Sequence, residues 1–470
     1  MGETNINSLF DLQESYIAFV NQWNNSYKLE TGHVRKAFCL TMGCQMNAHD
    51  SEKLIGMLQE MGYEITQTEN DADFIIYNTC CIRANAEEKV YGRLGWLKTL
   101  KKRNPNLILA ICGCMVQQNE VVEKIDKTYG FVDILFGTYN LYKLPELLSE
   151  RIKTSSKVRD IWTEQKEIVE EVPTVREHKF KASVNIMYGC DNFCTYCVVP
   201  YVRGRERSRR REDIIKEVEA LALGGVKEVM LLGQNVNSYG KNLESPTSFA
   251  QLLRDINQID GIGRIRFMTS HPKDLSDELI YAMRDCKKVC NYLHLPMQSG
   301  SSRLLNKMNR RYTKEQYLSL VDKIRHEIPD ISLSTDIIVG FPGETEKDFE
   351  ETIDVVKKCG FSSAFTFIYS KRPGTPAAAM DCQIDEETAH KRFNRLLDVL
   401  NTSIHNTQET KIGKTYNVLA EKESDKAGII TGRAEDNTLI HFNGGTDLIG
   451  NTIPVKITEN KTFYLIGERI

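Results

Sequence analysis

The stretch that decides the fold is YGCDNFCTYCVVPYVRGR, residues 188–205. It carries Cys190, Cys194 and Cys197 in a C-x3-C-x2-C spacing, directly after the apolar run VNIMY (184–188), which predicts a β-strand. Three thiolates can each hold one iron of a 4Fe–4S cluster, which leaves the fourth iron open. Tyr196 lies between the second and third cysteines, as suits such a loop. The spacing and the place at a strand end favour an iron–sulfur site.

An open iron can chelate the amino and carboxylate groups of S-adenosylmethionine (SAM), and an electron from the cluster can then cleave SAM to a radical. The motif therefore predicts a radical SAM enzyme. Two other interpretations exist. A structural zinc site usually has four protein ligands, and only three cysteines are present here. Three buried, inert thiols would give the same pattern.

Length and composition are those of an ordinary globular protein. The 470 residues suggest about three domains. Hydrophobic residues make up 41% and charged residues 27%. Because the net charge is only -3, bulk charge does not indicate a nucleic-acid partner, and that case must rest on local patches.

The chain has 13 cysteines, an odd number. No apolar stretch approaches the ~18 residues of a membrane span, and the N-terminus lacks the pattern of a signal peptide. We therefore expect a cytoplasmic protein with no membrane association. In that reducing compartment, clustered cysteines are metal ligands or catalytic thiols more often than disulfides.

Residues 181–405 alternate strand-like and helix-like segments around the cysteine motif. The predicted strands are 184–188, 228–233, 264–270, 292–296, 333–340 and 364–370. Six such units predict a partial (β/α)6 barrel, in which the chemistry takes place at the C-terminal ends of the strands.

The flanking regions differ from this core. Residues 33–150 predict an open parallel α/β domain, with strands at 37–42, 74–78, 107–112 and 132–136 and helices at 49–62, 86–103 and 117–129. Residues 1–32 form a polar extension with a weak helical pattern, and the charged residues 151–180 form a linker. Residues 408–470 contain five short strands separated by turns, which predict a small antiparallel β-barrel of OB-like size. These strands are 415–421, 428–434, 438–444, 452–458 and 462–468.

A second set of cysteines follows strands of the N-terminal domain: Cys44 in TMGCQMN, Cys80 in YNTCCIR and Cys114 in CGCMVQ. In an open parallel sheet the carboxyl ends of adjacent strands converge, so distant cysteines can meet there. Gly43 and Gly113 allow the backbone to approach a cluster closely. The helix N-termini that follow favour a negatively charged cluster. The spacing is thus compatible with a second three-cysteine cluster.

Each of these cysteines has an alternative. Cys81 is adjacent to Cys80, and Cys112 lies two residues before Cys114. We prefer Cys80 because it directly ends its strand, and we expect Cys112 and Cys39 to lie inside strands as core residues. From spacing alone, buried free cysteines explain the set as well as a cluster does.

SAM requires contacts beyond the cluster, and polar residues at later strand ends are the candidates. They are Gln234, Asn235, Ser270, His271, His294, Gln298 and Asp336. The backbone groups of the run Gly340–Glu344 are candidates to surround the adenine of SAM. The alternative for each is loop packing or a hydrogen-bonded polar group in the core, and His294 fits a core histidine equally well.

A dense basic run begins six residues after Cys197. It comprises Arg203, Arg205, Arg207, Arg209, Arg210 and Arg211. Arginine suits phosphates and stacking on bases, so these are candidate RNA contacts, with a solvated surface patch as the alternative. The C-terminal barrel has eight Lys/Arg against nine Asp/Glu from residue 408 onward. An OB-like barrel often binds single-stranded nucleic acid, but this charge leaves a protein-contact or purely structural role open.

The combination of TMGCQMN, NTC-x-IR and GC-M-V-Q with C-x3-C-T-Y-C-V-V-P-Y resembles the methylthiotransferases. Within them it is most similar to the tRNA 2-methylthio-N6-dimethylallyladenosine synthases. The resemblance extends from about residue 33 to the end, and the C-terminal barrel is similar to the TRAM module of that family. The further matching stretches are LLGQNVNSYG (231–240), RIRFMTSHP (264–272), HLPMQSGS (294–301), DIIVGFPGET (336–345) and RPGTPAA (372–378).

The resemblance implies two 4Fe–4S clusters, with Cys190, Cys194 and Cys197 binding the radical SAM cluster. A further set, Cys44, Cys80 and Cys114, would bind an auxiliary cluster whose open iron carries sulfur. Two SAM molecules would be used per product: one methylates the sulfur, and the other yields the radical that removes hydrogen from carbon 2 of the adenine. The implied substrate is the isopentenylated adenosine beside the anticodon, in the anticodon stem-loop of tRNA.

The resemblance also implies an electron-donor protein such as a flavodoxin or ferredoxin, and we expect a monomer. Related methylthiotransferases act on threonylcarbamoyl-adenosine in tRNA or on a ribosomal-protein aspartate, and these are the alternative substrates. The stretch LLGQNVN favours the dimethylallyladenosine branch by resemblance. A non-catalytic iron or zinc storage or scaffold protein is the alternative of a different class.

Overall fold

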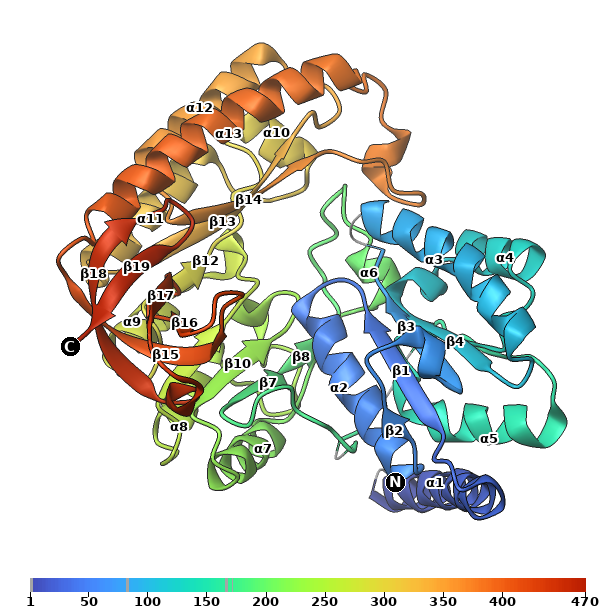
Figure 1. Cartoon of the computed structure of the whole chain (residues 1–470). Helices are drawn as coiled ribbons and strands as arrows, with labels where there is room; N and C mark the ends of the chain where they lie inside the picture. Colours follow the sequence, from blue (N-terminus) through green and yellow to red (C-terminus); the bar gives the residue numbers. More distant parts are fainter. Residues whose placement is uncertain (1–2, 82–83, 165–167, 171) are drawn as a thin grey trace. The chain divides into compact units, whose positions relative to one another are not determined.

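A computed structural model describes residues 3–81, 84–164, 168–170 and 172–470 (Figure 1). The chain divides into two compact units. The first comprises Met1–Glu177 and Val198–Arg205, and the second comprises His178–Cys197 and Glu206–Ile470. The sequence placed residues 181–405 in one domain, whereas the segment 198–205 packs with the first unit. The motif stretch 188–205 is therefore shared between the two units.

The first unit is built on a parallel sheet. Its strands in spatial order are β2(Glu64–Ile65), β1(Lys36–Thr41), β3(Phe74–Thr79), β4(Ile108–Gly113), β5(Ile134–Phe136) and β6(Val158–Asp160). Every residue of β3 and β4 is buried, as expected for parallel strands that are covered on both faces. The predicted open parallel α/β fold is confirmed for this unit.

Helices cover both faces of this sheet. The helices are α1(Glu3–Thr31), α2(Gln45–Glu60), α3(Ala84–Arg103), α4(Asn119–Thr128) and α5(Leu144–Thr154). One core contains Val20 of α1, Leu54 of α2 and Leu147 of α5. The other contains Leu94 of α3 and Ile125 of α4. Helices α1, α2 and α5 thus cover one face of the sheet, and α3 and α4 cover the other.

Two regions of the first unit differ from the sequence prediction. The region 151–180 was predicted as a linker, but its first ten residues contain the end of α5 and the strand β6. Strand β6 has only three residues, which is too short to show an apolar pattern. Residues 1–32 were predicted as an extension with a weak helical pattern, and α1 occupies nearly all of it. Residues 165–167 and 171 of the predicted linker lie outside the described residues.

The second unit contains the predicted partial barrel. Its parallel strands are β7(Lys181–Asn185), β10(Glu228–Leu232), β11(Arg264–Phe267), β12(Tyr292–His294), β13(Ser332–Val339) and β14(Ser363–Ile368). They form the sheets β11-β10-β7 and β12-β13-β14. A parallel bridge between Ile265 and Val289 joins β11 to the segment before β12. The short antiparallel pair β8(Met187–Tyr188) and β9(Arg207–Ser208) was not predicted.

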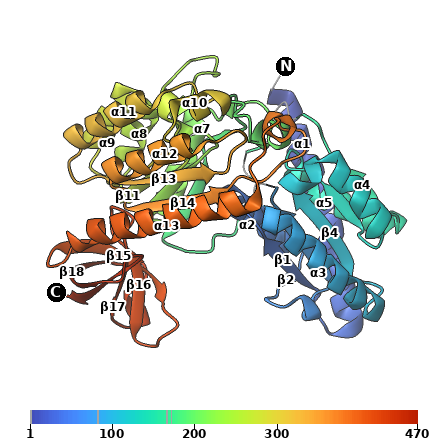
Figure 2. The same cartoon turned by 90° about the horizontal axis from the view of Figure 1, so that it is seen from above.

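Helices follow these strands and cover one face of the sheets (Figure 2). They are α7(Arg211–Leu223), α8(Phe249–Asn257), α9(Asp277–Asp285), α10(Ser302–Lys307), α11(Lys314–Glu327), α12(Glu346–Cys359) and α13(Glu386–Glu409). Two of them begin with a capping box, Thr313 with Gln316 at α11 and Thr345 with Asp348 at α12. Each box satisfies two backbone N–H groups that a helix start leaves without partners.

Alternation along the strands gives the second unit two kinds of surface. Val229 and Leu231 of β10 lie in the large core beneath the helices, as do Ile265 and Phe267 of β11. Because successive strand residues point to opposite faces, the intervening residues face away from the helices. His294, Asp336 and Phe365 occupy such positions, and we call the surface that they share the concave face.

The C-terminal strands form a closed barrel, as predicted. In order around the barrel they are β15(Thr415–Glu423), β16(Ile429–Arg433), β17(Leu439–Asn443), β19(Leu465–Arg469) and β18(Thr452–Asn460). The prediction of an antiparallel barrel needs one correction, because β17 and β19 pair in parallel. After β17 the chain enters β18, which lies on the other side of β19 from β17. Because β18 pairs antiparallel with β19, the closed barrel leaves β19 running in the same direction as β17.

Buried charges hold this barrel to the N-terminal ends of the strands of the partial barrel. Arg266 donates to the backbone oxygens of Ala434 (2.7 Å) and Glu435 (3.0 Å) and to the Glu228 carboxylate (3.0 Å). Arg264 donates to the backbone oxygens of Arg433 (2.8 Å) and Asn417 (2.6 Å). The C-terminal barrel therefore lies at the opposite end of the strands from the predicted cofactor site.

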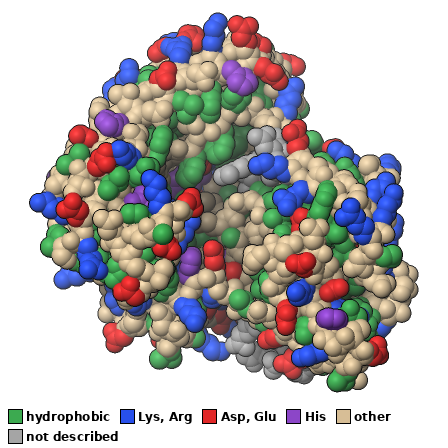
Figure 3. Space-filling model, in the orientation of Figure 1, with side chains coloured by type: hydrophobic (Ala, Val, Ile, Leu, Met, Phe, Trp, Pro, Cys, Tyr) green, Lys and Arg blue, Asp and Glu red, His purple; other side chains and the backbone are tan. Residues whose placement is uncertain are grey.

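Both acidic and basic side chains are visible on each unit on the face drawn in Figure 3, in keeping with the net charge of -3. No helix in the described part of the chain is long and apolar enough to cross a membrane.

Candidate cluster and cofactor sites

The three predicted auxiliary cysteines lie at one edge of the sheet in the first unit. Cys44 is the N-cap of α2, directly after β1. Cys80 follows β3, and Cys114 follows β4 as the first residue of the 3-10 helix η2(Cys114–Gln117). Because β1, β3 and β4 are neighbours in a parallel sheet, their carboxyl ends bring the three loops together, as the sequence predicted.

Glycines allow these loops to approach one another. Gly43 has a φ of 129°, and a Cβ atom there would lie 2.5 Å from the Cβ of Cys80 and 2.9 Å from its Sγ. Gly113 has a φ of 96°, and a Cβ atom there would lie 2.4 Å from the backbone oxygen of Thr79. Both positions combine a left-handed backbone with a contact closer than any side chain tolerates, so only glycine fits them.

Asn47 connects the three loops. Its Nδ2 donates to the backbone oxygens of Met42 (3.1 Å) and Thr79 (3.0 Å). Its Oδ1 lies 3.7 Å from the Sγ of Cys44 and 3.8 Å from the Sγ of Cys114. Asn47 was not among the predicted residues, although its position three residues after Cys44, on the first turn of the helix that Cys44 caps, is a usable signal.

Arg203 lies among the same side chains. Its Nε donates to the Sγ of Cys114 (3.2 Å), and its Nη2 donates to Asn47 Oδ1 (2.7 Å) and Asp50 Oδ2 (2.9 Å). The residue is only 5% exposed. That Arg203 contacts RNA stays a prediction that this structure does not favour, because an ion pair and a sulfur contact inside the first unit occupy its guanidinium.

Cys81 remains a rival of Cys80. The side chain of Cys81 packs against Cys114, Val198 and Val202. A hydrogen bond with Cys114, together with burial, raises the pKa of the Cys81 thiol well above its usual value. The same hydrogen bond lowers the pKa of Cys114 to about 6, against the effect of burial.

The other cysteines of this sheet lie in its core. Cys112 is fully buried, and Cys39 packs against the same cluster. Among the residues that the structure describes, no three His, Cys, Asp or Glu side chains are grouped so as to hold a metal ion. The assignment of Cys44, Cys80 and Cys114 therefore stays a prediction. Ile82 and Arg83 of the motif NTC-x-IR lie outside the described residues.

The loop that carries Cys190, Cys194 and Cys197 lies in the second unit, after β8. Phe193 adopts a φ of 46°, and the backbone N–H of Cys197 donates to the oxygen of Cys194 (2.9 Å), so Cys194 and Cys197 share one tight turn. The Asn309 side chain donates to the backbone oxygens of Asn192 (3.1 Å) and Phe193 (3.0 Å). These contacts fix the conformation of the loop.

A buried arginine stands beside this loop. The Nη1 of Arg310 lies 3.5 Å from the Sγ of Cys194, while Nη2 donates to the oxygen of Pro296 (2.9 Å) and Nε to the hydroxyl of Tyr312 (3.2 Å). Arg310 is 4% exposed. A cation held here would balance the negative charge of thiolate ligands. Arg310 was not predicted, because nothing local marks which arginine of the NRRY stretch (309–312) is buried.

Candidate SAM residues occupy the loops after β10 and β11. The Asn235 side chain donates to Asp274 (2.8 Å), and the backbone N–H of Val236 donates to the oxygen of Thr269 (3.3 Å). In this described region, Asn235 Oδ1, Ser270 Oγ and His271 Nε2 are buried without a hydrogen-bond partner. Buried polar atoms of this kind suit a polar ligand at the strand ends. Gln234 lies beside them and is half-buried.

The candidates on β12 and β13 divide into two groups. His294 is buried and contacts Ser334 Oγ (2.8 Å) and Asp336 Oδ1 (3.5 Å), which favours the alternative of a core histidine. The backbone of Gln298 bridges to β13, donating to the oxygen of Asp336 (2.7 Å). Asp336 itself is half-buried on the concave face, and its register partner Phe365 is 45% exposed. Phe365 was not among the predicted residues.

The run Gly340–Glu344 has a supporting role in this structure. Glu344 is buried, accepts the backbone N–H of Gly340 (2.9 Å) and pairs with Arg392 (2.9 Å). Phe341 is buried in a cluster against which Tyr196 of the cysteine loop packs. That this run frames an adenine stays a prediction.

Three family models match the chain. Residues 184–356 match the radical SAM superfamily, residues 36–137 match "Uncharacterized protein family UPF0004", and residues 409–470 match the TRAM domain. The radical SAM match implies a 4Fe–4S cluster and SAM. The TRAM match covers the closed C-terminal barrel.

Relatives over the full length are named tRNA-2-methylthio-N(6)-dimethylallyladenosine synthase. The one from Lachnoclostridium phytofermentans is 58% identical over 91% of this chain and 94% of its own. Those from Acetivibrio thermocellus and Clostridioides difficile are 55% and 54% identical over 97% of this chain and 95% and 96% of theirs. The chain belongs to this synthase family. The resemblance inferred from the motifs is thereby confirmed.

Solved structures support the fold of this synthase family member. The radical S-adenosylmethionine methyltransferase TsrM from Kitasatospora setae matches with a TM-score of 0.54 at 15% identity, over 73% of this chain and 77% of its own. At this identity the match bears on the fold alone, and it agrees with the partial barrel described above.

The arginine run of this synthase family member divides by burial. Arg209 is buried and donates to the oxygen of Asn185 (2.6 Å) and to Glu217 (2.7 Å), so its burial does not favour the prediction that it contacts RNA. Arg205 and Arg210 are exposed, and Arg210 pairs with Asp213 (2.8 Å). Arg207 is half-buried, and Arg211 is half-buried and pairs with Asp255 (2.5 Å).

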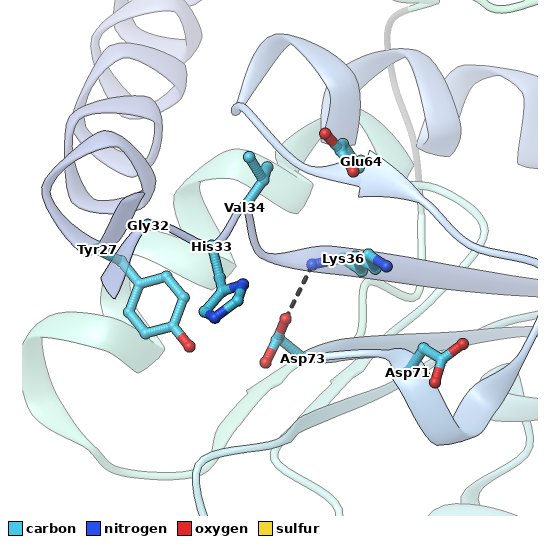
Figure 4. Close-up of a pocket in the computed structure, with 8 residues that line it drawn as sticks. All are labelled: Tyr27, Gly32, His33, Val34, Lys36, Glu64, Asp71 and Asp73. Carbon is cyan, nitrogen blue, oxygen red and sulfur yellow. Dashed lines mark hydrogen bonds between the residues drawn. The ribbon is translucent and has the colours of Figure 1, made fainter. Parts of the chain in front are cut away.

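A surface pocket of the first unit lies away from the cysteine loops (Figure 4). It is lined by Tyr27, Gly32, His33, Val34, Lys36, Glu64, Asp71 and Asp73. Lys36 begins β1 and its backbone N–H donates to Asp73 Oδ2 (2.9 Å), just before β3 begins. The pocket therefore lies at the amino ends of the strands, and it takes no part in the candidate site.

Proposed function

We propose that this chain is a radical SAM methylthiotransferase that adds a methylthio group to carbon 2 of N6-dimethylallyladenosine beside the anticodon of tRNA. The observation that carries the proposal is the presence of two separate cysteine triads at strand ends, in a chain whose full-length relatives bear this synthase name. The alternatives, threonylcarbamoyl-adenosine and a ribosomal-protein aspartate, gain no support from any feature described above.

In this proposal Cys190, Cys194 and Cys197 hold a 4Fe–4S cluster. When bound, this cluster and SAM supply a radical that can remove hydrogen from an unactivated aromatic carbon, which no acid or base of the chain can do. The donor set fits, because three cysteines lie within eight residues of one loop and two of them share a tight turn. Arg310 places a buried cation at Cys194, where it offsets the charge of the thiolates.

We assign Cys44, Cys80 and Cys114 to a second, auxiliary cluster that carries the sulfur. The fit rests on the three adjacent strand ends and on Gly43 and Gly113, which leave room for no side chain where the loops meet. Asn47 holds the loops in place through backbone oxygens of two of them. Cys81 is the alternative ligand to Cys80.

The loops after β10, β11 and β12 would position SAM in the proposed enzyme. Asn235 and Ser270 offer buried polar atoms, and Asp336 presents a carboxylate on the concave face beside Phe365. Gln234 and Gln298 complete the predicted set, and His294 orients Asp336 from the side. These residues bind and orient, and none of them needs to transfer a proton.

Three arginines remain candidates for contact with tRNA: Arg205, Arg207 and Arg210. A base in a single-stranded loop can be turned out of its stack without melting a duplex, and arginine suits the flanking phosphates. We further propose a monomer in the cytoplasm, reduced by an electron-donor protein such as a flavodoxin or ferredoxin.

Nucleoside mass spectrometry of tRNA from cells lacking this protein tests the substrate and the reaction together. We expect the 2-methylthio group to disappear and the isopentenyl group to remain, with recovery on re-expression of the chain. Loss of the methylthio group from threonylcarbamoyl-adenosine instead would favour the alternative. An unchanged nucleoside profile would refute the proposal.

A further inference from the structure

The guanidinium of Arg203 is buried beside the predicted auxiliary cysteines, and it comes from a segment outside helix α2, which carries its partners. Arg203 comes from the short segment Val198–Arg205, which packs with the first unit. It follows the helix α6(Val199–Val202), whose Val202 contributes to the cluster of buried side chains around Cys81 and Cys114. The backbone oxygen of Val202 also accepts the hydroxyl of Thr138 (2.9 Å), which fixes the segment at the position of Arg203.

One face of α2 receives the guanidinium. Asn47 and Asp50 are three residues apart and therefore lie on the same side of the helix, and each accepts from Nη2 of Arg203. The Sδ of Met46 lies 3.5 Å from Nη1. These contacts use one edge of the guanidinium and leave Nε to point at the sulfur of Cys114.

An ion pair made only for stability would explain part of this arrangement. Asp50 by itself neutralises Arg203, and a buried cation needs such a partner. The Nε contact to Cys114 is not required for that pairing. The planar guanidinium carries its donors in a fixed fork, so holding Nη2 on Asn47 and Asp50 also sets the direction of Nε. The geometry thus aims a charged donor at one predicted cluster ligand.

We propose that Arg203 is a positioning residue for the auxiliary cluster, donating a charged hydrogen bond to the Cys114 sulfur while Asn47 and Asp50 fix its orientation. The inference rests on the proposed function, because it presumes a cluster at Cys44, Cys80 and Cys114. Arg203 lies six residues after Cys197 in the chain. One continuous stretch therefore supplies thiolates to the radical SAM cluster and a cation to the auxiliary one.

Two consequences follow for the bound cluster. Hydrogen bonds to the sulfurs and the net charge of the site set the reduction potential of an iron–sulfur cluster, so removing the donor lowers that potential. Residues that orient metal ligands typically change metal retention by about 10- to 100-fold when they are replaced.

The test isolates the auxiliary cluster in the full chain. The parent carries Cys190→Ala, Cys194→Ala and Cys197→Ala, so only the auxiliary site can bind iron after anaerobic reconstitution. Arg203→Gln and the double variant Asp50→Asn/Arg203→Gln are made in this parent. The double variant removes the buried carboxylate that would otherwise lose its partner, so it keeps the test valid if the single variant folds poorly.

The matched control is Arg93→Gln, which removes another arginine of the first unit whose carboxylate partner, Glu69, lies 3.2 Å away and whose side chain is 46% exposed. Tryptophan fluorescence on heating checks folding, because Trp23, Trp96 and Trp162 all lie in the first unit. The readouts are iron and sulfide per chain, the rate of iron loss to a chelator, and a redox titration followed by electron paramagnetic resonance.

We expect the double variant to lose iron at least about tenfold faster than the parent and to have a lower midpoint potential. A tenfold change in the reduction equilibrium of a one-electron couple corresponds to about 59 mV. Arg203→Lys keeps the positive charge but not the planar arrangement of donors, so its rate of iron loss and its midpoint potential should lie between those of the parent and the double variant. Both values for Arg93→Gln should match those of the parent.

The outcomes separate this inference from the function on which it rests. A parent that binds no cluster would overturn the two-cluster proposal, and this inference with it. A parent that binds a cluster, with a double variant of equal potential and equal iron loss, would overturn the role of Arg203 alone.

Discussion

Replacing Arg266 with methionine should loosen the C-terminal barrel from the partial barrel. Methionine keeps much of the length of arginine but removes three hydrogen bonds, to Glu228 and to the backbone oxygens of Ala434 and Glu435. The side chains of Arg266 and Glu228 are only 2% and 1% exposed. The variant therefore leaves a carboxylate inside the protein without its nearest partner.

The contacts around Glu228 set the size of the effect. Removing one partner of a buried ion pair costs about 3–5 kcal/mol. Lys181 (3.3 Å) and Arg264 (3.8 Å) still contact Glu228 and place the ion-pair loss near the lower limit. Each lost hydrogen bond from a charged donor to a backbone oxygen is worth about 1.5–3 kcal/mol, part of which water restores. We expect a local loss of about 3–5 kcal/mol.

Hydrogen exchange measured by mass spectrometry is the suitable assay. The three tryptophans lie in the first unit, so their fluorescence does not follow this region. Every 1.4 kcal/mol is about a factor of ten, so amides of β11 and of residues 430–440 should exchange at least about 100-fold faster. Lys358→Met is the control, because its pair with Asp354 is roughly half exposed and should contribute less than about 1 kcal/mol. Unchanged exchange in Arg266→Met would refute the reasoning.

Three further predictions concern the candidate sites. Cys44→Ala should retain SAM-dependent 5′-deoxyadenosine formation and lose thiolation, measured by chromatography of both products; normal thiolation would contradict the assignment. Gly43→Ala should lower the melting temperature and the iron content, because its Cβ would lie 2.5 Å from that of Cys80, whereas Gly92→Ala, with nothing within 4 Å, should cause no loss. Burial lowers the pKa of His271 to about 2, below the value of about 6.5 in the unfolded chain, so the contribution of His271 to stability is fully present above pH 6.5 and falls on acidification by up to about 1.4 kcal/mol per pH unit. His271→Asn should therefore flatten the pH dependence of the free energy of unfolding between pH 6.5 and 5. An unchanged slope would count against this role of His271.

Much of the fold was predictable because it depends on local patterns. The strands of the first unit are buried on both faces and appear as continuous apolar runs, as in FIIYN at β3. The capping boxes at Thr313 and Thr345 are also visible in sequence. Strands β2 and β6 were missed because two or three residues carry no periodicity. The parallel pairing of β17 with β19 depends on how the barrel closes, which no local signal specifies.

The candidate sites were predictable where chain position decides them. Cys44 and Cys114 could be placed at one edge because each follows a strand, and parallel neighbours end at the same edge. The preference for Cys80 over Cys81 rests on chain position alone and stays a prediction, because adjacent residues after a strand end differ mainly in side-chain direction. Phe365 was missed because an aromatic residue in a strand usually indicates core, and only the register with Asp336 places it on the concave face.

The arginine run shows where sequence reasoning ends. Six arginines between residues 203 and 211 look alike as a basic patch, yet their environments differ. Arg203 and Arg209 are buried where carboxylates inside the units meet them: Asp50 is far from Arg203 in sequence, and Glu217 lies two turns into the helix that follows Arg209. An arginine becomes internal only where a partner compensates the cost of burying its charge, and that partner is set by tertiary structure. A cluster of positive charge in sequence therefore does not define a nucleic-acid surface: here two of the six arginines are internal cations, and the other four are exposed or half-buried.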